Sequence, residues 1–355
     1  MKVDSTQNID ELGVGRIRFI DALRGFTMTI VVFGHVMSSM GIGGYSSVLS
    51  SFFLTFRMPM FFFISGFIAF KPVEKWTSDF YLYSLKKKVK VQIIPALFFF
   101  TLFCLCHCKD PFNALSNGWG GYWFTFVLLE MFICYFTLSL IGHILNDKIV
   151  DIGMIIISFL GVAGIMFLRN HLMDTAFWNL LCLENTCKYF QFFTFGLLCR
   201  KYLNKFLVLI NNDIFRASCI LIFVCSFLLF FSARLQAFSS IIFSINHDIL
   251  VRYSGLVVVF FFFYSKKYYW DSKNKVTTSF LFIGRRTLDI YLLHYFLLPD
   301  LSFLKNYIQS DSLMVIQFIA SAAITLLIVG ICLILSEVIR SSRLLGHYLL
   351  GAKLK

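Results

Sequence analysis

Charged side chains are scarce in this sequence: Asp, Glu, Lys and Arg together make up 14% of its 355 residues, while 58% are hydrophobic. Soluble globular domains carry about 25% charged residues, so the composition excludes an ordinary soluble domain. The sequence also lacks the ten-residue segments of alternating hydrophobicity that mark a membrane β-barrel. Long apolar runs are present instead. They predict an all-α, polytopic membrane protein with no soluble domain.

The sequence shows neither a cleavable leader nor a cysteine framework. The first 17 residues are polar, and no small-residue cleavage site follows the next apolar run, so this run is expected to remain as a helix. The ten Cys lie scattered through apolar segments, where they pack as small side chains. Cys182 and Cys187 flank an expected outer loop and either form a disulfide or stay free. On a helix, the stretch "CLCHC" at 104–108 would point its side chains apart, so no metal site is expected.

The apolar runs divide the chain into membrane crossings. With about 20 apolar residues per crossing, about ten transmembrane helices are expected, of which the sixth and ninth are the least well defined. These segments are 18–40, 50–70, 92–108, 120–143, 150–168, 177–199, 214–233, 247–264, 279–299 and 312–336. The expected organisation is a cytoplasmic segment at 1–17, a transmembrane domain at 18–336 and a cytoplasmic tail at 337–355.

Basic residues outnumber acidic ones, giving a formal net charge of +13, and their distribution indicates topology. If the N-terminus is inside, 22 Lys and Arg fall on the inner side and 6 on the outer side. Cytoplasmic loops of membrane proteins are enriched in Lys and Arg, so both termini are expected in the cytoplasm. Most of these residues lie in short loops between apolar runs. This pattern does not favour a nucleic-acid partner.

Two ionisable residues, Arg24 and His35, interrupt the first apolar run, "RFIDALRGFTMTIVVFGHV". Eleven residues of helix place them on one face, about 16 Å apart along the axis. One interpretation is structural: Asp21 pairs with Arg24, and His35 caps a neighbouring carbonyl. The other is a functional face, with a cationic anchor near the cytoplasm and a deeper imidazole that removes a proton from a hydroxyl.

Other polar residues lie in or beside the second and third crossings. Arg57 stands next to Met-Pro, and Pro59 is expected to kink or break its helix. Gly66 allows a close approach between helices. The lysine run "KKKVK" is either a topology signal that contacts anionic lipid or a phosphate clamp. In the second case Lys87 and Lys90, one turn apart, are expected to act together.

Three more ionisable side chains are expected inside crossings. Asp289, in "FIGRRTLDIYLLHYF", can be neutralised by Arg285 or Arg286. His294, in the same stretch, is a second histidine well inside an apolar helix. Glu130 is the remaining buried acid, and its expected role is that of a structural partner for one of the arginines.

Taken in order, these motifs resemble those of the acyltransferase 3 family of integral-membrane acyltransferases. Arg24 and His35 resemble its Arg-x10-His signature. The other matches are "MPMFFFISGF" at 58–67 to the second-helix motif, "YWF" at 122–124 to the fourth-helix motif and "IGRRTLDIYLLH" at 283–294 to the penultimate-helix motif. Within the family the chain looks most like the fucose 4-O-acetylase-like branch.

The resemblance implies transfer of an acyl group, usually acetyl from cytoplasmic acetyl-CoA, to a hydroxyl of a cell-envelope polysaccharide or its lipid-linked precursor. The expected location is a bacterial inner membrane. Arg24 and His35 would be the essential pair, and Lys87 and Lys90 stand where the family often has Arg-x-x-Arg. Lysine offers only a point charge to a phosphate in place of a bidentate guanidinium. Arg57 also departs from the family, in which His is common before Met-Pro.

The expected mechanism joins the spacing and the resemblance. Arg24, Lys87 and Lys90 would bind the CoA phosphates, and the pantetheine arm would follow the first helix to His35. His35 would act as general base on the acceptor hydroxyl or accept the acetyl group itself, and His294 would assist or orient. The alternative function is a polysaccharide or small-molecule exporter that uses the same polar channel. A purely structural partner in an envelope assembly is a third possibility.

Overall fold

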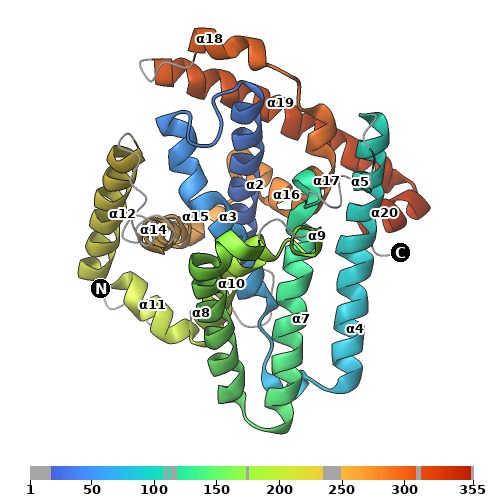
Figure 1. The fold of residues 1–355 in the computed structure, drawn as a ribbon, viewed down its shortest axis with the longest axis vertical. Helices are drawn as coiled ribbons and strands as arrows, with labels where there is room; N and C mark the ends of the chain where they lie inside the picture. The colour runs from blue at the N-terminus through green and yellow to red at the C-terminus, as the bar shows by residue number, and fades with distance from the viewer. Residues whose placement is uncertain are drawn as a thin grey trace. The chain divides into compact units, whose positions relative to one another are not determined.

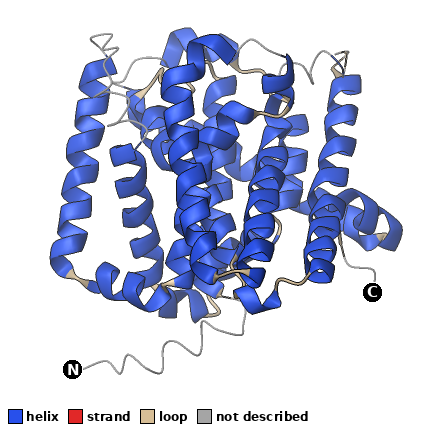
Figure 2. Ribbon diagram, turned by 60° about the horizontal axis from the view of Figure 1, so that its bottom comes forward, coloured by secondary structure: helices blue, strands red, loops and turns tan. Residues whose placement is uncertain are grey.

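The structure of this protein is a computed structural model that describes residues 17–107, 110, 112, 118–172, 176–234, 249–308 and 313–352. The expected N-terminal segment, apart from its last residue, and Cys108 of "CLCHC" therefore lie outside the described residues. Throughout the described part, the regular elements are helices and none is a strand (Figure 2).

Most of the described chain belongs to α-helices, labelled in Figure 1 where there is room. They are α2 (Arg18–Ser39), α3 (Val48–Ala69), α4 (Ser78–Lys88), α5 (Ile94–Cys106), α7 (Trp123–Ile144), α8 (Asp147–Leu172), α9 (Ala176–Leu180), α10 (Leu183–Lys201), α11 (Leu203–Asn211), α12 (Asp213–Arg234), α14 (Val251–Ser265), α15 (Lys267–Asp271), α16 (Lys275–Arg285), α17 (Thr287–Leu293), α18 (Lys305–Ile308), α19 (Met314–Ser341) and α20 (Arg343–Leu350). Shorter turns are η1 (Val73–Lys75), η2 (Val89–Ile93), η3 (Gly120–Tyr122), η5 (His294–Leu297) and η6 (Ser302–Leu304).

Six stretches of helix in the described residues are long and apolar enough to cross a membrane, and the bent pair α11 and α12 can add a seventh. This arrangement is that of a multi-pass, all-α membrane protein, but it does not reproduce the ten expected crossings. The sixth expected crossing is broken between α9 and α10, and α10 begins with the polar sequence "LENTCK". The eighth is the short helix α14. The ninth is interrupted at Arg286, between α16 and α17.

The helices form two compact units. Unit 1 contains residues 1–61, 202–287 and 299–327, and unit 2 contains residues 62–201, 288–298 and 328–355. Three of the five boundaries between the units fall inside helices, namely α3, α17 and α19.

Unit 1 is built around α2, which packs against α14, α15 and α16. Two glycines make the contact with α16 close: a Cβ added at Gly25 would overlap the carbonyl oxygen of Phe280, and one at Gly284 would overlap that of Asp21. Small residues at such positions let helix backbones approach each other in a membrane. Close packing at Gly25 therefore fixes the position of the neighbouring Arg24.

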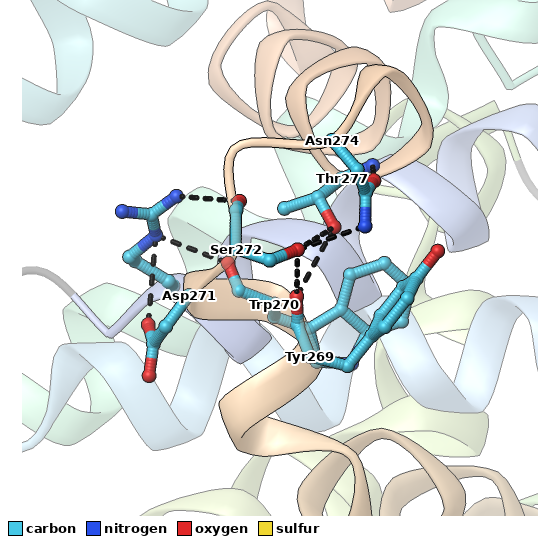
Figure 3. Close-up of polar contacts among 7 residues, drawn as sticks. Tyr269, Trp270, Asp271, Ser272, Asn274 and Thr277 are labelled. Atoms are coloured by element: carbon cyan, nitrogen blue, oxygen red, sulfur yellow. Dashed lines mark hydrogen bonds and ion pairs between the residues drawn. The ribbon is translucent and has the colours of Figure 1, made fainter.

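The start of α2 is tied to the turn between α15 and α16 (Figure 3). Arg18 Nε donates to the carbonyl oxygen of Trp270 at 3.1 Å and lies 3.6 Å from the Asp271 carboxylate. Asn274 Oδ1 caps α16 by accepting from the backbone N–H of Thr277 at 2.7 Å. The N-terminal end of α2 is thus anchored to the turn before α16, which Asn274 caps.

Unit 2 contains the packed helices α7, α8 and α10, together with residues 62–69 of α3. A Cβ at Gly66 would overlap the carbonyl oxygen of Phe193 on α10, and a Cβ at Gly196 would overlap that of Phe63 on α3. The close helix approach expected at Gly66 is therefore present. Pro59 was expected to kink or break its helix, and a break is absent, because α3 continues through this residue.

A wide helical turn separates α4 from α5. The segment η2 is a π-helix, and the N–H of Ile94 bonds to the carbonyl of Val89, five residues earlier. Pro95 follows in the first turn of α5 and lacks the N–H that an α-helical turn at this point requires. The wider turn changes the angular relation between Lys87 and Lys90, which an uninterrupted α-helix would place nearly above one another.

Candidate functional site

Arg24 is held by a residue from the other end of the sequence. Its guanidinium Nη2 donates a 2.8 Å hydrogen bond to Oγ1 of Thr287, the first residue of α17. Both residues belong to unit 1, and Arg24 is half-buried. The contact connects the first-helix motif to the "GRRTLD" motif across 263 residues of sequence.

Replacing Thr287 with valine removes this acceptor and keeps the shape of the side chain. The sequence motifs predict that Arg24 binds the acyl donor. A hydrogen bond to a charged group contributes about 1.5–3 kcal/mol, so on this prediction the donor affinity falls by roughly tenfold or more. Equilibrium binding of labelled acetyl-CoA to purified protein measures the effect. Thr287→Ser keeps the hydroxyl and is the matched control. Equal affinity of the valine variant and the wild type would contradict a role for this bond.

His35 lies on the same continuous helix as Arg24. Because α2 is unbroken from Arg18 to Ser39, the two side chains are separated by about 16 Å along its axis. His35 is half-buried. Met28 and Val31 lie on the same face between them and are only 1% and 6% exposed. A ligand arm that follows this face therefore requires these two apolar side chains to move.

Arg57 places a second guanidinium beside the His35 turn of α2. A Cβ added at Gly34 would overlap the guanidinium of Arg57, so this group occupies the space that the missing side chain leaves. Gly34 immediately precedes His35, and all three residues belong to unit 1. The arrangement places a positive charge next to the backbone of His35. The sequence alone did not predict this position of Arg57.

In unit 2, His294 is fully buried, and its ring is oriented by the chain itself. Its Nδ1 lies 3.0 Å from the carbonyl oxygen of Ile290, and the Tyr295 ring centroid is 4.0 Å from its own. A carbonyl only accepts hydrogen bonds, so the neutral imidazole holds its hydrogen on Nδ1 and its lone pair on Nε2. The structure thus fixes the tautomer of His294.

Asp289 pairs with a residue that local spacing did not indicate. Its carboxylate accepts two hydrogen bonds from Arg340 on α19, at 2.7 and 2.8 Å, and a third from Ser336 Oγ at 2.5 Å. The expected neutralisation by Arg285 or Arg286 is therefore replaced by a bidentate pair with Arg340. This geometry satisfies a buried carboxylate better than a pair along one helix does.

Glu130 also has a different partner from the one expected. Its Oε2 accepts a hydrogen bond from Thr186 Oγ1 at 2.5 Å, and among the described residues no arginine forms an ion pair with it. The prediction of an arginine partner for Glu130 is therefore wrong. Thr186 lies on α10 and Glu130 on α7, so the bond connects two packed helices of unit 2.

Lys87 and Lys90 line two different cavities of unit 2. Lys87 lines a cavity of about 350 Å³ together with Lys71 and Lys88, and aromatic side chains complete its wall. The aromatic residues are Trp76, Phe80, Tyr83, Phe132 and Phe136. Lys90 lines a separate cavity beside α20. The expected joint action of Lys87 and Lys90 is therefore replaced by a cluster around Lys87, because Lys87 lies in α4 and Lys90 lies inside the π-helical turn η2.

In the described part of the chain, the structure shows neither a disulfide between Cys182 and Cys187 nor a metal-binding cluster. Cys182 and Cys187 are both free thiols, and Cys104 is buried whereas Cys106 is exposed. No group of three or more His, Cys, Asp or Glu side chains in the described ranges is arranged to hold a metal ion.

These features define a class: a multi-pass membrane protein with arginine and histidine side chains inside one of its spans. The model of the acyltransferase 3 family, described as an acyltransferase domain, matches residues 17–337. The chain therefore belongs to the acyltransferase 3 family and is a membrane acyltransferase. No curated protein and no solved structure matches it.

Proposed function

We propose that this protein transfers an acetyl group from cytoplasmic acetyl-CoA to a hydroxyl of a cell-surface polysaccharide or its lipid-linked precursor. The observation that chiefly supports the proposal is the unbroken helix α2, which presents the half-buried Arg24 and His35 about 16 Å apart. An extended pantetheine arm has a comparable length. Arg24 would then bind a phosphate of the donor, and His35 would act at its thioester end.

The chemistry at His35 requires a proton acceptor and a stabiliser of negative charge. In the proposed step, His35 removes the proton of the acceptor hydroxyl, the hydroxyl oxygen attacks the acetyl carbonyl carbon, and the CoA thiolate leaves and takes up a proton. Alternatively, His35 accepts the acetyl group and passes it on. In either route the Arg57 guanidinium beside Gly34 would stabilise the oxyanion that develops on the carbonyl oxygen. His294 keeps its supporting role in this proposal.

The role of Arg57 can be tested without removing its charge. Gly34→Ala places a methyl group where the guanidinium lies, so the guanidinium has to shift while the arginine remains. Loss of one oxyanion stabiliser lowers kcat by about 100- to 1000-fold, and we expect Gly34→Ala to approach this range with donor affinity unchanged.

Gly330→Ala is the matched control for this substitution. A Cβ at Gly330 meets nothing within 4 Å, so the same helical glycine-to-alanine change should leave acetyl transfer intact. Comparable kcat values for Gly34→Ala and Gly330→Ala would remove Arg57 from the mechanism.

The cavity around Lys87 in unit 2 has, by itself, the chemistry that the nucleotide part of a CoA donor would need. Acetyl-CoA brings phosphate groups and an adenine ring, and this cavity offers the ammonium groups of Lys71, Lys87 and Lys88 beside aromatic rings. Lys88 Nζ lies 3.6 Å from the centroid of the Phe132 ring, so its charge is already placed over an aromatic wall. Lysines bind phosphate as point charges, and adenine stacks on aromatic side chains.

Substituting Lys87 and Lys88 with glutamine should weaken acetyl-CoA binding and leave the acceptor step intact. We expect the KM for acetyl-CoA to rise by about tenfold or more, with kcat changed much less, because two point charges on phosphate are lost. Desulfo-CoA binding measured by calorimetry gives the same comparison without turnover. The control is Lys75→Gln with Lys148→Gln, two exposed lysines of the same unit that do not line the cavity. An unchanged KM would refute the assignment.

The proposed setting is a bacterial inner membrane with both termini in the cytoplasm. The charge asymmetry of 22 inner against 6 outer Lys and Arg supports this orientation. The donor would then enter from the cytoplasm, where acetyl-CoA is made.

A further inference from the structure

A second cavity of unit 2 lies between the α4–η2 segment and the C-terminal helix α20. It has a volume of about 410 Å³, and its lining is almost entirely apolar. Leu82, Val89 and Ile94 contribute one wall, and Tyr348 contributes the other. Leu82 and Ile94 are 49% and 46% exposed, so the groove opens to the surroundings of the protein. This surface is suited to an apolar chain.

Two lysines stand on the rim of this groove. Lys86 and Lys90 are exposed, line the same cavity and are four residues apart along one helical segment. His347, on the opposite wall, donates from Nδ1 to the carbonyl oxygen of Ala352 at 2.7 Å, since a carbonyl only accepts. No acidic side chain lines the groove. Its charged groups are therefore positive, and they would attract an anion.

The C-terminal helix that closes the groove has the character of an interfacial helix. Leu344 and Leu345 are 66% and 50% exposed, and Tyr348, which lines the groove, is 60% exposed. Its position is fixed, because Arg340 Nη2 donates to the Leu350 carbonyl at 3.3 Å while it also binds Asp289. A short helix that keeps large apolar side chains exposed next to a membrane span is stable when it lies in the headgroup region.

We propose that this groove binds one anionic glycerophospholipid of the inner leaflet. The phosphate would lie against Lys86 and Lys90, and an acyl chain would lie along Val89 and Ile94. An apolar floor with a cationic rim matches an anionic headgroup joined to a hydrocarbon chain, and basic residues at a membrane surface attract anionic lipid. The site is separate from the cavity around Lys87, and the proposal does not depend on acetyl transfer.

The full-length protein, purified in detergent, should bind phosphatidylglycerol more tightly than phosphatidylcholine with the same acyl chains. Native mass spectrometry of a lipid titration measures both affinities. We expect Lys86→Gln with Lys90→Gln to lower the affinity for phosphatidylglycerol by about 30-fold and to leave phosphatidylcholine unchanged, as expected for two lysines at a membrane surface. The control pair Lys75→Gln with Lys148→Gln should behave as wild type. Equal affinities of the Lys86/Lys90 variant and the wild type would overturn the proposal.

A second variant tests the groove without changing its charge. Val89→Trp fills the space between α4–η2 and α20, so the occupancy of either lipid should fall, and normal occupancy would exclude the groove as the site. Acetyl-CoA should not displace phosphatidylglycerol from the wild type. Displacement would show that Lys86 and Lys90 belong to the donor site and would likewise overturn the lipid assignment.

Discussion

His35→Ala is expected to reduce acetyl transfer at least 1000-fold while acetyl-CoA still binds. The imidazole is the proton acceptor, or the acetyl carrier, of the proposed step, and its removal leaves the other binding groups in place. Single-turnover kinetics with labelled acetyl-CoA and equilibrium binding of the same ligand separate the two effects. The protein should still insert, because an alanine in α2 is more compatible with a membrane span than a histidine.

Arg24→Ala provides the contrasting variant on the same helix. It should lose donor affinity as well as transfer, because its guanidinium is assigned to a donor phosphate and is positioned by Thr287. Cys106→Ser, at an exposed position on α5, should retain wild-type rates. Normal transfer by a well-expressed His35→Ala protein would refute the assignment of His35, and an unchanged donor affinity for Arg24→Ala would refute that of Arg24.

Asp289→Ala is expected to destabilise the protein by about 3–5 kcal/mol, the largest stability effect of any single substitution considered. Asp289 is 1% exposed and accepts three hydrogen bonds, so its removal leaves the Arg340 guanidinium without its carboxylate partner. Thermal unfolding in detergent, followed by intrinsic fluorescence, measures the change in midpoint.

Asp271→Ala is the control for this ion pair. Asp271 pairs with Arg18 at 3.6 Å, but its side chain is 58% exposed, and an exposed pair contributes about 0–1 kcal/mol. The two variants should therefore differ clearly in unfolding midpoint. Similar midpoints would mean that the Asp289–Arg340 pair does not stabilise the fold.

Long apolar helices were predictable from the sequence, and interrupted ones were less so. The first five expected crossings and the last correspond to the six apolar spans of the described residues, since an apolar run of this length has to satisfy its backbone within a helix. The ninth was expected as one helix, but the chain turns at Arg286. Hydropathy averages over such a turn and therefore does not detect it.

The candidate site was predictable only where its spacing is local. The position of Arg24 and His35 on one helix follows from their separation of eleven residues. Thr287 and Arg340, the partners of Arg24 and Asp289, come from distant segments of the chain. The i,i+3 and i,i+4 rules consider only nearby residues, so they predicted Arg285 or Arg286 as the partner of Asp289. Gly34 indicates that another group can approach α2 closely at this position. The sequence does not identify that group, which is the Arg57 side chain in the structure.

The most direct test of the proposed function uses membrane vesicles that contain wild-type or His35→Ala protein. The vesicles receive acetyl-CoA labelled in the acetyl group and the producing strain's own polysaccharide or lipid-linked precursor. We predict that label appears in saccharide with the wild type and is absent with His35→Ala, at equal protein levels. If the wild type binds no acetyl-CoA and transfers no label, the proposed reaction is wrong. In that case the polar residues of α2 would favour the exporter.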